Sequence, residues 1–180
     1  MPKLFFAVIP PAELQSQLQE TFIPHIQKFS NEWRISNPEQ WHITIHFIGI
    51  VSKKAEEKIR EGFEHISLPR LGRVKLGGFP PLETFRKNIL FVRVEDENQT
   101  LSKTYESLRS IVPVHQAHPN AFHLTLARIK KKKKLDHFEG ILSSPPFTST
   151  FLVRELILFR SEQVEGKTIH IPLGKRSFPL

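Results

Sequence analysis

Trp41-His42-Ile43-Thr44-Ile45 and Phe122-His123-Leu124-Thr125-Leu126 are two segments with the same pattern of residue types. Each has an aromatic residue and a histidine, followed by a threonine between two aliphatic residues. This alternation predicts a β-strand, in which residues two apart point to the same face. We therefore expect the histidine and threonine of each segment to share one face, while the aliphatic residues face a core.

The sequence around these two segments also repeats. Each is preceded by a strand-length apolar run and then by a stretch with helical periodicity, at 4–9 and from Ala12 in the first half, and at 89–94 and from Leu101 in the second. Further elements are expected as follows: a helix over 55–66, a strand over 73–79, a weaker helix over 130–142, and strands over 151–159 and 168–173. The order predicts an internal duplication in a single domain, 1–180, with repeats starting near residues 4 and 89. A pseudo-two-fold axis would bring the two His-x-Thr faces together across a cleft.

Composition limits the class of protein. A chain of 180 residues that is 39% hydrophobic and contains 15 phenylalanines can bury the core of one ordinary domain. It contains no cysteine, which excludes disulfides, thiolate–zinc sites and thiol catalysis. Its apolar runs are too short to span a membrane, and its beginning does not resemble a secretory signal. We therefore expect a cytoplasmic protein.

The charge is strongly basic, with a formal net charge of +8. Such an excess favours polyanionic partners, namely nucleic acid, nucleotides or an anionic membrane surface. The run from Lys130 to Lys134 is its densest part. Two interpretations of this run stay equally open: a solvated surface that aids solubility, and a patch that follows phosphates beside the second motif.

Two histidines with neighbouring hydroxyls suit acid–base chemistry on a phosphate ester. The pKa of histidine, about 6.5, lies near neutrality. One imidazole can therefore take a proton from an attacking water while the other donates a proton to the leaving oxygen. The hydroxyls of Thr44 and Thr125 can donate hydrogen bonds to the non-bridging phosphate oxygens. His42 and His123 are the candidate catalytic pair, and this chemistry requires no metal.

Two nearby residues are further candidates. Arg128 follows His123 by five positions and faces away from it under strict alternation; a bulge or the strand end would turn it toward a phosphate, and the alternative is an arginine in solvent. His46 shares the predicted face of His42 and either contacts the substrate or lies at the rim, which we favour slightly. The rival hypothesis is a zinc site from His42, His46 and His123, but no carboxylate is interleaved with either motif. The remaining histidines show no shared pattern and are expected to be surface or packing residues: His25, His65, His115, His118, His137 and His170.

The two motifs and their surroundings resemble the two-histidine phosphoesterase superfamily. The detail resembles its LigT-like branch, the RNA 2′,3′-cyclic phosphodiesterases historically called 2′-5′ RNA ligases. The resemblance covers the whole chain and rests on four segments: Leu4-Phe5-Phe6-Ala7-Val8-Ile9-Pro10, Trp41-His42-Ile43-Thr44-Ile45-His46-Phe47-Ile48-Gly49, Phe122-His123-Leu124-Thr125-Leu126-Ala127-Arg128 and Ser177-Phe178-Pro179-Leu180. It implies an α+β, bilobal fold, in which two pseudo-symmetric lobes each carry an antiparallel sheet and helices beside a central cleft.

The resemblance also implies an activity. We expect metal-independent hydrolysis of an RNA-terminal 2′,3′-cyclic phosphate to a 2′-phosphate, with 2′-5′ ligation of RNA as the weak reverse reaction. The implied roles are general acid for His42, general base for His123, phosphate contacts for Thr44, Thr125 and Arg128, and base stacking for Phe6, although a core position suits Phe6 better on sequence grounds alone. The expected partner is RNA or a nucleotide with a 2′,3′-cyclic phosphate end. No cofactor, metal or membrane is expected, and we expect a monomer.

Two other functions stay open. A non-catalytic module that binds RNA ends would use the same basic surface, but it would not need an intact histidine pair. A sibling phosphodiesterase acting on ADP-ribose cyclic phosphate or on 2′-5′ oligoadenylate would keep both motifs. The chain departs from the family pattern at Phe122, where relatives often have proline, and at His46, where they often have lysine or arginine.

Overall fold

The computed structural model describes residues 3–112, 121–130 and 138–180. The first half of the chain forms these elements: β1 (Lys3–Val8), α1 (Ala12–Gln27), β2 (Trp33–Ile35), the 3-10 helix η1 (Pro38–Gln40), β3 (Ile43–Ile50), α2 (Lys53–His65), β4 (Arg73–Gly78) and β5 (Leu82–Phe85). The second half forms these: β6 (Ile89–Glu95), α3 (Thr100–Leu108), β7 (His123–Ile129), α4 (Phe138–Leu142), β8 (Phe147–Leu152), β9 (Glu155–Val164) and β10 (Lys167–Ser177). None of the helices in these ranges is long and apolar enough to cross a membrane.

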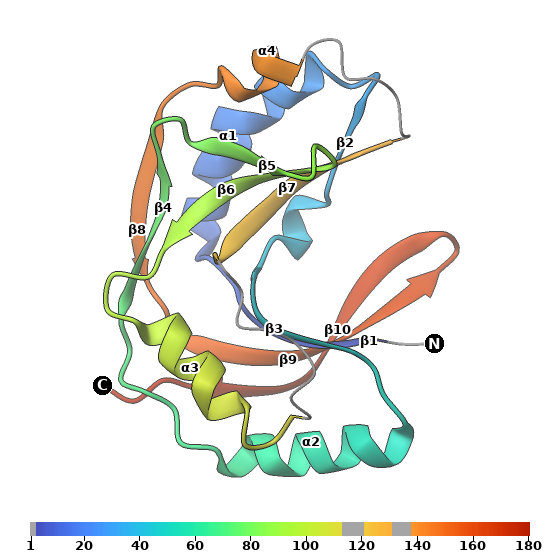
Figure 1. Cartoon of the computed structure of the whole chain (residues 1–180), viewed down its shortest axis with the longest axis vertical. Coiled ribbons are helices and arrows are strands. Elements are labelled where there is room, and N and C mark those ends of the chain that lie inside the picture. Colours follow the sequence, from blue (N-terminus) through green and yellow to red (C-terminus); the bar gives the residue numbers. More distant parts are fainter. Residues whose placement is uncertain (1–2, 113–120, 131–137) are drawn as a thin grey trace.

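The strands form one strongly curled antiparallel sheet (Figure 1). Its order is β10-β9-β1-β3-β7-β6-β4-β8, with β2 paired to β7 and β5 paired to β6. The two motif strands, β3 and β7, are therefore neighbours at the centre of the sheet, where Ile43 pairs with Leu124. On one side of this junction lie β1, β9 and β10, and on the other lie β6, β4 and β8. The α+β class predicted from the sequence is confirmed, and the strands expected in two separate lobes join in one continuous sheet.

The helices cover the sheet through apolar stripes. Helix α1 buries Leu14, Leu18, Phe22 and Ile26, which are spaced four apart and so share one face. Each such side chain contributes roughly 1.5–3 kcal/mol when fully buried. Helix α2 begins at an N-cap, Ser52, whose hydroxyl accepts a hydrogen bond from the Ala55 amide at 3.2 Å. These patterns explain why the predicted helices form where they do.

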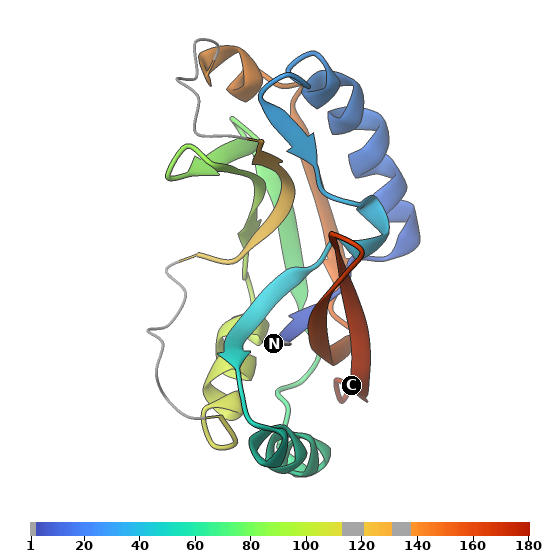
Figure 2. The same ribbon diagram turned by 90° about the vertical axis from the view of Figure 1, so that its right-hand side faces the viewer.

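Two of the helices cross from one half of the sheet to the other. Helix α1 follows β1, yet its Phe22 ring packs against Phe147 of β8, with centroids 5.3 Å apart. Figures 1 and 2 both show α1 beside β8. Helix α3 follows β6, yet its Tyr105 ring stacks on His46 of β3 at 5.0 Å. Each half of the sheet is thus covered in part by a helix from the other half.

Some predicted boundaries differ from those observed. The strand expected over 151–159 is divided at Val153 and Arg154, because the chain leaves β4, the partner of β8, and joins β1, the partner of β9. The short strands β2 and β5 were not predicted, since three or four residues carry too little periodicity. Of the basic run, Lys130 is described, and positions 131–134 lie outside the described residues.

Candidate active site

One pocket, of about 820 Å³, is lined by both motifs. His42 and Thr44 enter it from the first half, and His123 and Thr125 enter it from the second. The pocket is also bounded by β1, β2 and the hairpin of β9 and β10, which projects away from the body of the sheet in Figure 1. The aliphatic neighbours of the motifs are buried on the other side. The structure therefore brings together the four polar side chains of the two motifs.

Main-chain carbonyls orient both histidine rings in the same way. The Nδ1 atom of His42 lies 2.7 Å from the carbonyl oxygen of Gln40, and the Nδ1 atom of His123 lies 3.4 Å from that of Ala121. A carbonyl oxygen can only accept a hydrogen bond, so Nδ1 carries the proton and donates it. This leaves Nε2 of each imidazole as the nitrogen that can exchange a proton with a ligand. In both halves the accepting carbonyl belongs to the residue two positions earlier.

The pocket also perturbs the acidity of both rings. The pKa of His42 is lowered to about 4, mainly by burial and to a smaller extent by the charges of His170, Arg128 and His123, against the opposing effect of the Gln40 carbonyl. Burial is also the main cause that lowers the pKa of His123, with a smaller contribution from Arg128. Both imidazoles are therefore neutral at pH 7 in the free protein. A phosphate anion bound between them would raise both pKa values, because a nearby negative charge favours the imidazolium.

A β-bulge follows the threonine of each motif. In the pairing of β1 with β3, Ala7 lies opposite Thr44 and Phe6 opposite His46, so the register skips Ile45. The pairing of β6 with β7 skips Leu126 in the same way. An extra residue in one strand reverses the alternation beyond it. Arg128, which strict alternation would place on the far face, lines the pocket for this reason.

The same bulge corrects the predicted position of His46. Beyond Ile45 the alternation is reversed, and the His46 ring is only 5% exposed and stacks on Tyr105 of α3. It is not among the residues that line the pocket, and its Nδ1 atom has no hydrogen-bond partner among the described residues. Phe47 occupies the pocket side instead and is 41% exposed. His46 is therefore not placed to contact a ligand in the pocket.

The aromatic side chain expected on β1 is also different. Phe6 is fully buried and packs against Phe63 of α2, with ring centroids 5.1 Å apart. Its neighbour Phe5 lines the pocket and lies 4.9 Å from the His42 ring. A central strand that is apolar on both faces gives no sequence signal for which of two adjacent phenylalanines faces the pocket. The structure thus excludes Phe6 from the pocket and places Phe5 there.

His170 and Arg34 are among the pocket residues that the sequence analysis missed. His170 of β10, expected to be a surface or packing residue, lies edge-on to His42 with ring centroids 5.2 Å apart. Arg34 of β2 lies opposite Arg128 of β7 in the strand register. Both belong to strands that carry no motif, so no local pattern marks them. They reach the pocket because the sheet curls.

The structure does not bring together the three histidines of the alternative zinc site. His42 and His123 share the pocket, whereas His46 lies on the opposite face of β3. Within 3–112, 121–130 and 138–180, no group of three or more histidine, cysteine, aspartate or glutamate side chains is placed to hold a metal ion. The pocket instead presents imidazoles, hydroxyls and guanidinium groups, which are ligands for an anion.

Solved structures share this fold over nearly their full length. LigT of E. coli, complexed with NADP+, superposes with a TM-score of 0.77 at 22% identity, covering 99% of this chain and 98% of that one. TT0787 of Thermus thermophilus gives 0.75 at 25% identity, covering 98% and 97%. A phosphoesterase gives 0.71 at 21% identity, covering 99% and 98%. These structures confirm the resemblance at the level of the fold.

No known family model matches the chain. No curated protein sequence matches it either.

Proposed function

We infer that this chain belongs to the LigT-like two-histidine phosphoesterase family, and we propose that it hydrolyses the 2′,3′-cyclic phosphate at an RNA end to a 2′-phosphate. One observation carries the proposal: two histidines from equivalent strands enter one pocket with Nδ1 held by a main-chain carbonyl. Both rings would therefore offer Nε2 to a ligand bound in this pocket. Paired imidazoles that face one phosphorus atom can deliver and remove a proton in a single displacement.

The proposed reaction is an in-line attack of water on phosphorus. Nε2 of His123 takes a proton from the water as the new P–O bond forms. The bond between phosphorus and O3′ breaks, and O3′ receives a proton from Nε2 of His42, leaving the phosphate on O2′. The products are a 3′-hydroxyl and a 2′-phosphate, and the two histidines exchange protonation states.

The lowered pKa values agree with this division of roles. A low pKa makes the His42 imidazolium a strong proton donor once the bound phosphate has favoured its protonation. The pKa of His123 is lowered less, so its neutral form is the stronger base of the two. Thr44 and Thr125, at equivalent positions, would donate hydrogen bonds to the two non-bridging oxygens. Arg128 would neutralise the charge that these oxygens carry in the transition state.

The composition of the pocket supports a nucleotide ligand. Phe5 and Phe47 give it apolar surface beside the histidines, and Arg128 gives it positive charge. LigT of E. coli has been crystallised with NADP+, ATP, 3′-AMP and phosphate. Each of these is an anion, and three of them are nucleotides. With a 5′-hydroxyl of another RNA in place of water, the same histidines would join the two chains: the P–O5′ bond forms, the P–O3′ bond breaks, O3′ takes a proton, and a 2′-5′ linkage remains.

The test is turnover of nucleoside 2′,3′-cyclic phosphates, with the product identified by phosphorus NMR. We expect a 2′-phosphate, formed at the same rate with and without EDTA. His42→Ala and His123→Ala should each lower kcat by about 10²-fold or more. His65→Ala, an exposed histidine at the end of α2, is the matched control and should be unchanged.

Other outcomes would point to the alternatives. Tight binding of the cyclic phosphate without turnover would indicate an RNA-end binding module. Turnover confined to ADP-ribose cyclic phosphate or to 2′-5′ oligoadenylate would indicate a sibling phosphodiesterase. Loss of activity in EDTA that added metal restores would contradict the proposed mechanism.

A further inference from the structure

Two arginines stand side by side at one end of the pocket. Arg34 of β2 and Arg128 of β7 are opposite each other in the antiparallel register, and both line the pocket. Their Cα atoms are therefore roughly 4.5–5.5 Å apart. The pKa of Arg128 is lowered, first by burial and then by the positive charge of Arg34, which agrees with two guanidinium groups close together. Neither arginine has an ion-pair partner in the part of the chain that the structure describes.

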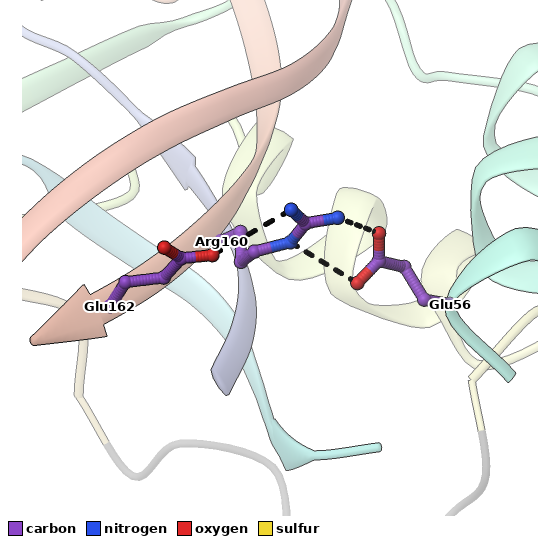
Figure 3. A network of polar contacts seen from close by, with 3 residues as sticks. All are labelled: Glu56, Arg160 and Glu162. Carbon is purple, nitrogen blue, oxygen red and sulfur yellow. Dashed lines mark hydrogen bonds and ion pairs between the residues drawn. The ribbon is translucent and has the colours of Figure 1, made fainter. Parts of the chain in front are cut away.

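Among the described residues, the pocket offers no free carboxylate to pair with these two arginines. Glu162 is the carboxylate among the side chains that line it, and it lies on the hairpin of β9 and β10. Its oxygen is 3.6 Å from the guanidinium of Arg160, which is also bound by Glu56 of α2 (Figure 3). Glu162 thus already forms an ion pair with another arginine, Arg160. Lys3 and Lys167 add further positive charge to the pocket wall.

One phosphate does not account for both arginines. In the proposed reaction the reacting phosphodiester carries a single charge, which the two threonines, Arg128 and a protonated histidine already meet. A guanidinium binds phosphate through two parallel hydrogen bonds, so a second arginine suits a second anionic group. Strand β2 pairs with β7 at 127–129, farther along β7 than the motif. Arg34 therefore lies beside Arg128, at a level five residues along β7 from His123, where a nucleotide chain would carry a second phosphate.

We propose that Arg34 is a substrate-binding residue that takes a second phosphate, next to the reacting one that Arg128 contacts. In a chain ending in a 2′,3′-cyclic phosphate, this is the 5′-phosphate of the terminal nucleotide. The preferred substrate is then the end of a nucleic acid chain or a 5′-phosphorylated nucleotide, rather than a free cyclic nucleoside. This inference rests on the proposed function.

The test compares two substrates that differ by one phosphate: adenosine 2′,3′-cyclic phosphate with and without a 5′-phosphate. Wild type should have the higher kcat/KM for the 5′-phosphorylated form. Arg34→Gln should lower kcat/KM for that form by about tenfold, the loss of one charge-assisted pair, and leave the unphosphorylated form within about twofold. Arg34→Lys should keep part of the preference, because it keeps the charge but not the fork.

Arg60→Gln is the matched control, since it removes one exposed positive charge from α2, outside the pocket. An equal loss on both substrates would overturn the inference, because Arg34 would then act on the reacting phosphate. No loss on either substrate would overturn it as well.

Binding of the products separates this inference from the proposed function. Titration calorimetry with adenosine 2′-phosphate and adenosine 2′,5′-bisphosphate needs no turnover. We expect wild type to prefer the bisphosphate by about tenfold and Arg34→Gln to lose that preference. Failure of wild type to turn over any cyclic phosphate, with the preference intact, would reject the reaction and retain the second phosphate site. If wild type turns over a cyclic phosphate but does not prefer the bisphosphate, the reaction is retained and the second phosphate site is rejected.

Discussion

The pair β1–β3 and the pair β6–β7 have the same backbone register and different side chains. In both, the bulge comes three residues after the histidine, at Ile45 and at Leu126. The residue five positions after the histidine is Phe47 in the first pair and Arg128 in the second, and both line the pocket. The repeated backbone thus presents the histidine and threonine twice. The side chain after the bulge gives one wall of the pocket an apolar surface and the other a positive charge.

The surroundings of the two histidines have also diverged. An aromatic ring lies 4.9 Å from each: Phe5 beside His42 and Phe91 beside His123. The two phenylalanines are not at equivalent positions, because Phe91 lies opposite the motif threonine, where the first pair has Ala7. His42 is packed in addition by His170, and its pKa is the more strongly lowered. Equivalent backbone positions can therefore hold an acid and a base of different strength.

The largest effect should come from removing each histidine and following kcat/KM with pH. His42→Ala and His123→Ala should each cost about 10²–10⁴-fold. A base must be neutral, so activity rises with pH through its pKa, and an acid must be protonated, so activity falls through its pKa. We expect His123→Ala to lose the rising limb and His42→Ala to lose the falling limb. The opposite result would exchange the two roles.

The residues after the bulges should differ in their effect on catalysis. Arg128→Gln removes a charge from the reacting phosphate and should lower kcat by roughly 10²-fold, within the range for one transition-state donor. Phe47→Leu keeps an apolar side chain and should change kcat less than about fivefold while raising KM. Steady-state kinetics on one cyclic nucleotide measure both. Equal losses in kcat would show that the two walls have not diverged in function.

A smaller effect is expected on the pH profile. Because burial lowers the pKa of both catalytic histidines, the maximum of kcat/KM should lie below pH 6.5, the ordinary pKa of histidine. The charge of His170 lowers the pKa of His42. His170→Gln should therefore move the limb that belongs to His42 to higher pH, with little change in the maximal rate. A profile that does not move would remove His170 from the electrostatics of the site.

The smallest effect should come from His46, whose equivalent in the second pair is Ala127. His46→Leu should leave kcat/KM within about twofold. Burial lowers the pKa of His46 in the folded state, so the unfolded chain takes up the proton first and stability falls as pH drops below about 6.5. The variant should reduce this loss by on the order of 1 kcal/mol or less. Urea unfolding at pH 7.5 and pH 5 measures it, and a steeper loss in the variant would contradict the placement of His46.

The sequence was sufficient for the repeated elements and for the four polar side chains of the motifs, because alternation determines which face a residue takes. It was insufficient beyond the bulges, where one extra residue reverses the alternation. In β7, two adjacent apolar residues, Leu126 and Ala127, break the alternation and so indicate the bulge. In β3, the polar His46 follows Ile45, so the alternation looks unbroken and gives no such indication. Arg34 and His170 could not be found, since their contacts depend on how the sheet curls.

Because strands and helices of each half pack on the other half, a fragment that contains one half alone should not fold. Strand β4 follows α2 but pairs with β6, and β9 follows β8 but pairs with β1. Helices α1 and α3 cross over in the same sense. A fragment ending near residue 87 would therefore leave both its own sheet and its own helix without their partners. Strands from the two halves of the chain are interleaved in one sheet, and we therefore expect the halves to fold only together.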